Sequence, residues 1–314
     1  MRAVTIRDQG LLVEHHPDPI PGGGEVLVRV RAAGLNGADM MQVRGHYPAP
    51  PGAPQDIPGL ELAGEVAETG TGANRFKLRD RVMSIVAGGG QAELAVVHER
   101  VLMPVPDNLT WPEAGGVPEV FTTAHDAIFT QAGLRSGERL LVQGAAGGVG
   151  TAAIQLARAA GARVTATVRD PELRDRVAGL GAEVIAPETF SKHGPFDVIL
   201  ELVGAPNLPD DVNSLATSGR ITVIGIGAGA KAELNLGALM AKRGRIYGST
   251  LRPRPVEEKA LTARWVERSV LPLLADGTVH VPIAATYPLD QAEVAYDRFA
   301  AGRKFGKIVL EMDR

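Results

Sequence analysis

The sequence of 314 residues contains no cysteine. Composition alone therefore excludes disulfide bonds, cysteine-ligated zinc, iron–sulfur clusters and a thiol nucleophile. Aromatic residues make up only 4% of the chain. No apolar run approaches the ~20 residues that a membrane-spanning helix requires, so a membrane is not an expected partner.

An excess of charge of one sign is missing as well. Lys and Arg together number 33 and Asp and Glu 36, which gives a formal net charge of -3. No Lys/Arg-dense run is present that could follow a phosphate backbone, so nucleic acid is not an expected partner. The first residues lack the basic start, apolar middle and small-residue cleavage site of a secretory signal, and the expected location is the cytoplasm.

The length and a change of pattern along the chain predict two domains. A chain of 314 residues exceeds the ~250–300 residues at which single cores stop growing. The first hundred residues form short runs of alternating apolar and polar positions between Gly/Pro loops, which is typical of a small β-barrel or sandwich. From about Trp111, strands alternate with helical periods, as in βαβ units with a parallel sheet. The predicted fold class is therefore α/β.

Within the second half we expect strands at residues 139–143, 163–168, 196–202 and 220–225, and helices at 151–160 and 171–180. A third section from about Arg252 predicts one amphipathic helix through Trp265 and Leu274, and a final strand at 307–311.

A glycine-rich loop lies between a predicted strand and a predicted helix: Gly144-Ala145-Ala146-Gly147-Gly148-Val149-Gly150. In this context such a loop binds the pyrophosphate of a dinucleotide, because the backbone approaches closely and the helix N-terminus offers free N–H groups. Ala145 departs from the usual G-x-G-x-x-G pattern, so the turn must accept a Cβ. We expect Ala146, Gly147, Gly148 and Val149 to bind the cofactor; the alternative is a glycine-rich turn with no ligand.

The end of the second predicted strand indicates which nicotinamide cofactor is used. NAD-dependent proteins place an Asp or Glu there for the ribose, whereas this strand ends in Arg169, whose guanidinium suits the 2′-phosphate of NADPH. Asp170 could be read as the NAD-type acid, but its position before Pro171 favours a helix N-cap. Arg174 either assists Arg169 or lies on a solvated helix face.

Several separated motifs carry a resemblance to a known family. They are Asn36-Gly37-Ala38-Asp39, Gly45-His46-Tyr47-Pro48, Pro58-Gly59-Leu60-Glu61-Leu62-Ala63-Gly64 and the loop from Ala145 to Gly150 with its continuation Thr151-Ala152-Ala153-Ile154-Gln155. Over nearly its whole length the chain resembles the medium-chain dehydrogenase/reductases, and among them the quinone oxidoreductases of the zeta-crystallin group.

The resemblance implies a GroES-like β-barrel catalytic domain from residues 1–117 and 254–314, and a doubly wound Rossmann domain from residues 118–253. It further implies NADPH as cofactor, an active site in the cleft, and a homodimer or homotetramer joined through the Rossmann sheets. Zinc-dependent relatives would have Cys ligands and a His where Leu60 stands, so no metal is expected here.

By resemblance, Asn36 and Tyr47 are the candidate catalytic residues. Tyr47 could stack on a flat acceptor and offer a hydrogen bond to its oxygen, or it could simply anchor its loop. Thr123 resembles a residue at the nicotinamide end, with helix capping as the alternative. The remaining candidate cofactor contacts are Gly225, Gly227, Ser249, Thr250, Leu251 and Lys307, the last of which could equally be a surface lysine.

Without a metal, such a protein has to hold the nicotinamide against an electron-poor acceptor and stabilise charge on the acceptor oxygen. The sequence thus predicts an NADPH-dependent quinone reductase. Two alternatives stay open: an enone or enal double-bond reductase, and a cofactor-bound structural or regulatory protein. The acidic balance of charge disfavours RNA binding.

Overall fold

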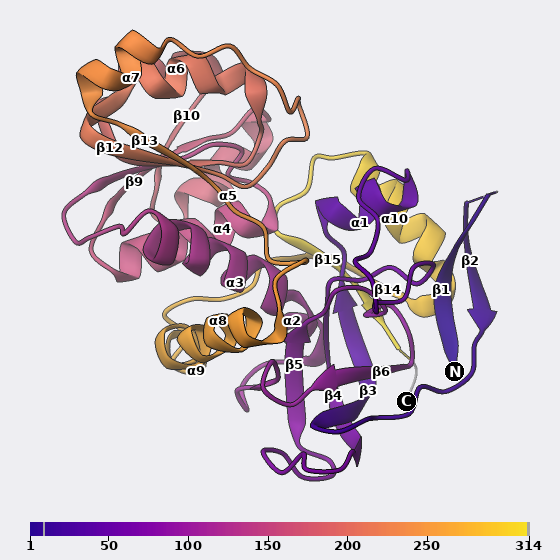
Figure 1. The fold of residues 1–314 in the computed structure, drawn as a ribbon. Coiled ribbons are helices and arrows are strands. Elements are labelled where there is room, and N and C mark those ends of the chain that lie inside the picture. Colours follow the sequence, from indigo (N-terminus) through magenta and orange to yellow (C-terminus); the bar gives the residue numbers. More distant parts are fainter. Residues whose placement is uncertain (9, 313–314) are drawn as a thin grey trace. The chain divides into compact units, whose positions relative to one another are not determined.

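The computed structural model describes residues 1–8 and 10–312 (Figure 1). The chain folds into two compact units. The β unit comprises Met1–Thr122, Leu251–Gly302 and Lys307–Arg314, and the α/β unit comprises Thr123–Thr250 and Arg303–Gly306.

The α/β unit is built on a six-stranded parallel sheet with the order β10-β9-β8-β11-β12-β13. Counted along the unit, this is the order 3-2-1-4-5-6 of a doubly wound dinucleotide-binding fold, so the predicted fold class is confirmed. The strands are β8 (Arg139–Val142), β9 (Arg163–Thr167), β10 (Glu183–Ile185), β11 (Phe196–Glu201), β12 (Leu215–Val223) and β13 (Arg245–Gly248).

Helices lie on both faces of this sheet, with α6 and α7 on one face and α4 and α5 on the other (Figure 1). Buried Phe196, Ile199 and Val212 belong to the apolar cluster that α7 packs against through Leu239. The helices of the unit are η1 (Asp126–Gln131), α4 (Gly148–Ala159), η2 (Pro171–Leu173), α5 (Arg174–Ala178), η3 (Pro187–Lys192), η4 (Ala205–Asn207), α6 (Leu208–Asn213) and α7 (Leu236–Lys242). The helix α3 (Pro118–His125) spans the boundary between the β unit and the α/β unit.

Two predicted helices are divided in the structure. The predicted helix at 171–180 starts as the 3₁₀ turn η2 and continues as the short α5, which ends at Ala178 before Gly179 and Gly181. The predicted helix through Trp265 and Leu274 is two helices, α8 (Val256–Ser269) and α9 (Leu271–Ala275), because Pro272 cannot donate an N–H inside a continuous helix.

The β unit contains a two-stranded sheet, β1 with β2, and a seven-stranded sheet with the order β14-β15-β3-β4-β5-β7, in which β6 also pairs with β3. The C-terminal β15 lies antiparallel to β3, with Val309 opposite Gly34. The tail of the chain therefore completes the sheet of the first hundred residues.

The strands of this unit are β1 (Arg2–Arg7), β2 (Gly10–His15), β3 (Glu25–Gly34), β4 (Glu61–Thr69), β5 (Arg81–Ile85), β6 (Leu94–His98), β7 (Met103–Pro104), β14 (Ile283–Pro288) and β15 (Lys307–Glu311). Its further helices are α1 (Gly37–Val43), α2 (Trp111–Gly116), η5 (Leu289–Gln291) and α10 (Ala292–Ala300). The short β7 pairs with β5, and the following Val105 N–H donates to the Arg81 carbonyl oxygen at 3.0 Å.

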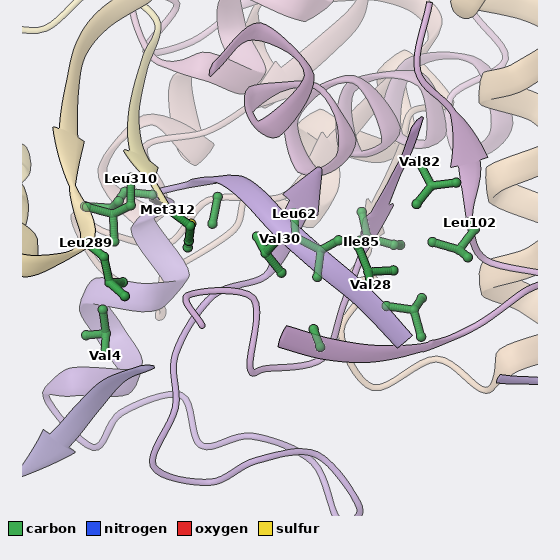
Figure 2. Packing of buried hydrophobic residues seen from close by; sticks show 14 of the residues in the cluster. Val4, Val28, Val30, Leu62, Val82, Ile85, Leu102, Leu289, Leu310 and Met312 are labelled. Atoms are coloured by element: carbon green, nitrogen blue, oxygen red, sulfur yellow. The ribbon is translucent and has the colours of Figure 1, made fainter. Parts of the chain in front are cut away.

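The core of the β unit follows the period-2 alternation of its strands. Val28 and Val30 of β3 point to the same side as Leu62 of β4 (Figure 2), and all three side chains are at most 2% exposed. Burial of such side chains contributes about 1.5–3 kcal/mol each.

One short segment near the C-terminus belongs to the α/β unit. The Gly306 N–H donates to the Ala146 carbonyl oxygen at 3.0 Å, and Gly306 bridges to Gly147. The predicted boundaries placed this segment in the catalytic domain, because a backbone contact of this kind leaves no sequence pattern. Among the described residues, no helix combines the length and the apolar character needed to cross a bilayer.

Candidate functional site

The glycine-rich loop connects β8 to α4, at the place in the fold that the sequence predicted for it. Gly144 takes the positive φ of +70°, so the following Ala145 avoids the left-handed region and its Cβ is accepted. Gly147 is the N-cap of α4, and a Cβ built on it would meet nothing within 4 Å. A Cβ on Gly150 would lie 2.5 Å from the Ala145 oxygen, so only glycine permits this close helix–strand packing.

Three residues predicted to bear on cofactor choice, Arg169, Asp170 and Arg174, follow β9. Arg169 is exposed just beyond the strand, and the Arg174 Nε donates to the Val168 carbonyl oxygen at 3.1 Å. The Asp170 side chain accepts the Glu172 N–H at 3.1 Å with Pro171 in the first turn, so the N-cap interpretation of Asp170 is confirmed. Arg174 thus packs back toward the strand end that carries Arg169.

The other candidate cofactor residues of the α/β unit follow the carboxyl ends of β12 and β13, on the same sheet edge as the loop. Gly225 comes after β12, and a Cβ there would lie 2.1 Å from the Leu202 oxygen. The Ser249 Oγ donates to the Asp126 Oδ2 at 3.1 Å. Gly227 and Thr250 are exposed. The carboxyl edge of a doubly wound sheet is where such folds bind ligands.

Thr123 is buried in the last turn of α3. Helix capping was the alternative role of Thr123, but α3 begins at Pro118 and contains Thr123. Capping of a helix N-terminus by Thr123 is therefore wrong.

Two other candidates, Leu251 and Lys307, belong to the β unit. Leu251 is 7% exposed and is part of the apolar core cluster. Lys307 is 3% exposed, and its Nζ donates to three acceptors: the Leu35 carbonyl oxygen at 2.8 Å, the Asn36 Oδ1 at 2.7 Å and the Glu61 Oε1 at 2.5 Å. All three protons of the ammonium are used, a geometry that favours a structural role over the predicted cofactor contact.

The Asn36 side chain is held from both ends of its amide. Its Oδ1 accepts from Lys307, and its Nδ2 donates to the Glu61 Oε1 at 2.9 Å and to the Gly34 carbonyl oxygen at 3.3 Å. Glu61 is fully buried and also accepts the Glu119 N–H at 2.8 Å. Asn36 therefore has no N–H left for an acceptor, although one lone pair of its oxygen remains.

Asp39 adds a buried acid beside this network. Its two oxygens accept the Asn36 N–H at 2.8 Å and the Gly59 N–H at 3.2 Å. Complete burial raises the pKa of Asp39 from 3.8 to about 7, although both N–H groups and the charge of Lys307 oppose the shift.

This shift predicts a pH-dependent stability. Below about pH 4 the Asp39 carboxyl is protonated in both folded and unfolded chains, whereas between about pH 4 and pH 7 only the folded chain retains the proton. Stability from this group is thus lost as pH rises toward 7. Chemical unfolding from pH 4 to 7 should show a smaller loss in Asp39→Asn than in the wild type. Equal slopes would mean that Asp39 is ionised in the fold.

Tyr47 is half-buried and lies against Arg252, which is 5% exposed. The Arg252 Cζ is 5.0 Å from the centre of the Tyr47 ring, and its Nη1 donates to the Tyr47 carbonyl oxygen at 2.8 Å. Its Nε donates to Ala87 O at 2.7 Å and its Nη2 to Gln42 Oε1 at 2.6 Å. One guanidinium thus fixes the backbone and one ring face of Tyr47.

The sequence missed the residues that hold the candidates in place. Glu61 lies inside the quoted Pro58-to-Gly64 motif and Arg252 directly follows Leu251, yet nothing in their local pattern distinguishes them from surface charges. Only their burial among partners distant in sequence identifies them.

Two family models match the chain. Residues 22–107 match the alcohol dehydrogenase GroES-like domain, and residues 148–267 match the zinc-binding dehydrogenase model. A quinone oxidoreductase of Mus musculus is 31% identical, with 93% of this chain and 90% of that protein covered. The chain belongs to the medium-chain dehydrogenase/reductase superfamily.

Two further members of the superfamily are similar over nearly the full length. The acryloyl-coenzyme A reductase of Metallosphaera sedula is 31% identical, with 99% of both chains covered. The crystal structure of the quinone oxidoreductase of Thermus thermophilus, solved also in complex with NADPH, superimposes with a TM-score of 0.85 at 33% identity and covers 99% of this chain and 100% of that one. The predicted family is confirmed, and with it an NAD(P)-binding Rossmann domain.

One of the matching models is named for zinc, so the donor groups of this chain matter. The described residues contain no cluster of three or more His, Asp or Glu side chains that could share a metal ion, and the whole sequence lacks cysteine. These donors do not fit a zinc site of this superfamily, and we assign no step to a metal.

Proposed function

We propose that this protein is an NADPH-dependent reductase that transfers a hydride to a quinone without a metal ion. The observation that carries the proposal is the likeness to quinone oxidoreductases along both units, including a structure solved with NADPH. The glycine loop leads into the N-terminus of α4, a position that suits a phosphate, and the described residues contain no cluster of three or more His, Asp or Glu side chains that could hold zinc.

The preference for NADPH rests on the residues after β9. Arg169 is exposed and presents a permanent positive charge, and Arg174 is anchored beside it. The Asp170 side chain already accepts the Glu172 N–H as an N-cap, and its Oδ2 lies 3.9 Å from the Arg303 Nε. Asp170 is therefore poorly placed to bind the ribose hydroxyl groups of NAD. An arginine at this point of the fold suits a 2′-phosphate. We also include Ala146 to Val149, Gly225, Gly227, Ser249 and Thr250 in the proposed cofactor site.

The cofactor supplies the hydride when bound, and the residues of this chain bind and orient the reactants. The loop N–H groups and the N-terminus of α4 would hold the pyrophosphate. We assign Tyr47 to stacking on the acceptor and to a hydrogen bond from its phenol, and Arg252 lies over the Tyr47 ring with its Cζ 5.0 Å from the ring centre. Asn36 can only accept a hydrogen bond, so Tyr47 is the donor that we assign to the acceptor oxygen.

A second candidate is reduction of an activated carbon–carbon double bond. The likeness to an acryloyl-coenzyme A reductase over 99% of both chains favours it, and the chemistry requires the same cofactor and a similarly electron-poor acceptor. The product separates the two candidates: a saturated carbonyl compound for an enone, and a hydroquinone for a quinone.

The experiment follows NADPH oxidation with a panel of ortho- and para-quinones and an enone, in the wild type and in Tyr47→Phe. Loss of one hydrogen bond is expected to lower kcat/KM for quinones about 3–10-fold. Tyr287→Phe, which changes another half-buried tyrosine of the β unit, should leave kcat/KM unchanged.

Turnover of the enone alone would replace the quinone assignment by double-bond reduction. Binding of NADPH without turnover of any acceptor would contradict an enzymatic role and support the structural or regulatory alternative. Equal kcat/KM in Tyr47→Phe and wild type would show that Tyr47 anchors its loop and does not serve the acceptor.

We further propose a homodimer formed through β13. This strand is the outer strand of the six-stranded sheet, and Leu236 and Met240 of the neighbouring α7 are 65% and 76% exposed. An open edge beside exposed apolar side chains favours pairing with a second copy. Sedimentation velocity should give a dimer or tetramer in the wild type and a smaller species in Met240→Glu; a wild-type monomer would contradict this.

The cytoplasmic location stays a prediction of the sequence.

A further inference from the structure

Four polar side chains are buried beneath the glycine loop, at the carboxyl edge of the α/β sheet. They are Gln143, directly after β8, Thr167 at the end of β9, Glu201 at the end of β11 and Asp211 on α6. Their exposed fractions are 0% or 1%, and none was predicted as a site residue. Buried polar groups without partners are costly, so their hydrogen bonds show what this cluster holds in place.

On one side, the cluster holds the start of the loop. Thr167 holds two successive N–H groups, because its Oγ1 accepts from Gly144 at 3.0 Å and its carbonyl oxygen accepts from Ala145 at 3.0 Å. The hydroxyl proton of Thr167 goes to the Gln143 Oε1 at 2.8 Å. The positive φ of Gly144 is thus set by a hydroxyl whose direction depends on the Gln143 amide.

On the other side, the cluster ends in two carboxyl groups. The Gln143 Nε2 donates to the Asp211 Oδ1 at 2.9 Å. Glu201 accepts the N–H groups of Val203 and Gly204, the latter at 2.7 Å, and the Asn207 Nδ2 at 3.1 Å. These three donors stabilise a negative charge on Glu201.

The second oxygen of Asp211, Oδ2, has no donor among the described residues, and the neighbouring side chain within hydrogen-bonding reach is the Glu201 carboxyl. Burial, followed by the charge of Glu201, raises the pKa of Asp211 well above its usual range. A proton on Asp211 removes the repulsion between two neighbouring carboxylates. The neutral acid then donates a hydrogen bond to Glu201 and still accepts one from Gln143.

We propose that Asp211, as a neutral carboxylic acid, is a positioning residue for the dinucleotide phosphates. Its carbonyl oxygen fixes the Nε2 of Gln143, which turns the Gln143 Oε1 toward Thr167. Thr167 in turn fixes the N–H groups at the start of the phosphate loop. With the Gln143 amide reversed, Thr167 would face an NH₂ group and its hydroxyl proton would lose this acceptor. The inference rests on the proposed binding of NADPH by this loop.

The test compares four variants by two measurements: the Kd for NADPH from its fluorescence, and amide hydrogen exchange of peptides covering residues 143–150. Asp211→Asn copies the neutral acid, since its oxygen accepts from Gln143 and its NH₂ donates to Glu201. Asp211→Leu removes both bonds, and Thr167→Val removes only the hydroxyl. Asp210→Asn, which changes the exposed neighbour, is the matched control.

Asp211→Asn and Asp210→Asn should retain the wild-type Kd and exchange. Thr167→Val and Asp211→Leu should raise the Kd about 3–10-fold and speed exchange in the loop, with the KM of the acceptor unchanged. If Asp211→Asn weakened binding as much as leucine does, the neutral acid would be excluded; if Thr167→Val left Kd and exchange unchanged, the cluster would only fill the core. Should the leucine variant not fold, Thr167→Val decides.

Failure of the proposed function is recognised separately. A wild type that binds no NADPH would contradict the cofactor assignment. Loop exchange in Thr167→Val and Asp211→Asn would still test whether the cluster orders the loop, because that measurement needs no cofactor.

Discussion

Lys307→Met is expected to destabilise the protein by about 3–5 kcal/mol, because the variant leaves the fully buried carboxylate of Glu61 without its ammonium partner. The loss extends to the Leu35 carbonyl oxygen and to Asn36, which also accept from Lys307. Denaturant unfolding of the apo protein measures the effect. Lys242→Met, a lysine at the end of α7 with no part in the network, is the control.

Combining Lys307→Met with Glu61→Gln should recover part of the loss, since the charge left unpaired by the single change is then removed. The same variants separate the structural role of Lys307 from the cofactor contact that the family resemblance implies. A cofactor ligand would give weaker NADPH binding at nearly unchanged stability. That result would contradict the buried geometry of Lys307.

Arg169→Ala is expected to weaken NADPH binding about 10–100-fold while NADH binding stays within about twofold. The 2′-phosphate is the only group that distinguishes the two cofactors, and a charge-assisted contact to it is lost only for NADPH. The Kd values are measured by cofactor fluorescence at fixed ionic strength, because exposed charges are screened by salt.

Arg163→Ala provides a matched control, since Arg163 is an exposed arginine at the opposite end of β9. It should change neither Kd. An equal loss of NADPH and NADH affinity in Arg169→Ala would mean that Arg169 binds a group that both cofactors contain. No change in either Kd would show that another group binds the 2′-phosphate, and the assignment of NADPH would lose its main support.

Much of the α/β unit could be predicted from the sequence, because its signals are local. The strand–glycine loop–helix order around Gly147 was predicted from the sequence and is present in the structure, although α4 begins at Gly148 and not at residue 151 as predicted. Asp170 before Pro171 likewise predicted its own N-cap. The helix predicted through Trp265 and Leu274 was too long, because Pro272 divides it into two helices.

The sequence predicted which residues of the β unit are candidates, but it did not predict their burial or their hydrogen-bond partners. Asn36 was expected to serve the acceptor, yet its amide donates only to Glu61 and Gly34. Lys307 is separated from Glu61 by 246 positions, and no pattern in the sequence predicts that the two side chains form an ion pair.

The sequence by itself predicted the family, through its resemblance to known motifs, and the alternation of strands and helices with a glycine loop between them, which depends on spacing within a few tens of residues. Only the tertiary structure decided which buried polar groups contact one another. These are the Lys307–Glu61–Asn36 network, the Arg252–Tyr47 contact and the Asp211–Glu201 pair. The physical reason is that the energy of a charged group depends on its burial and partners, which are long-range properties of the fold.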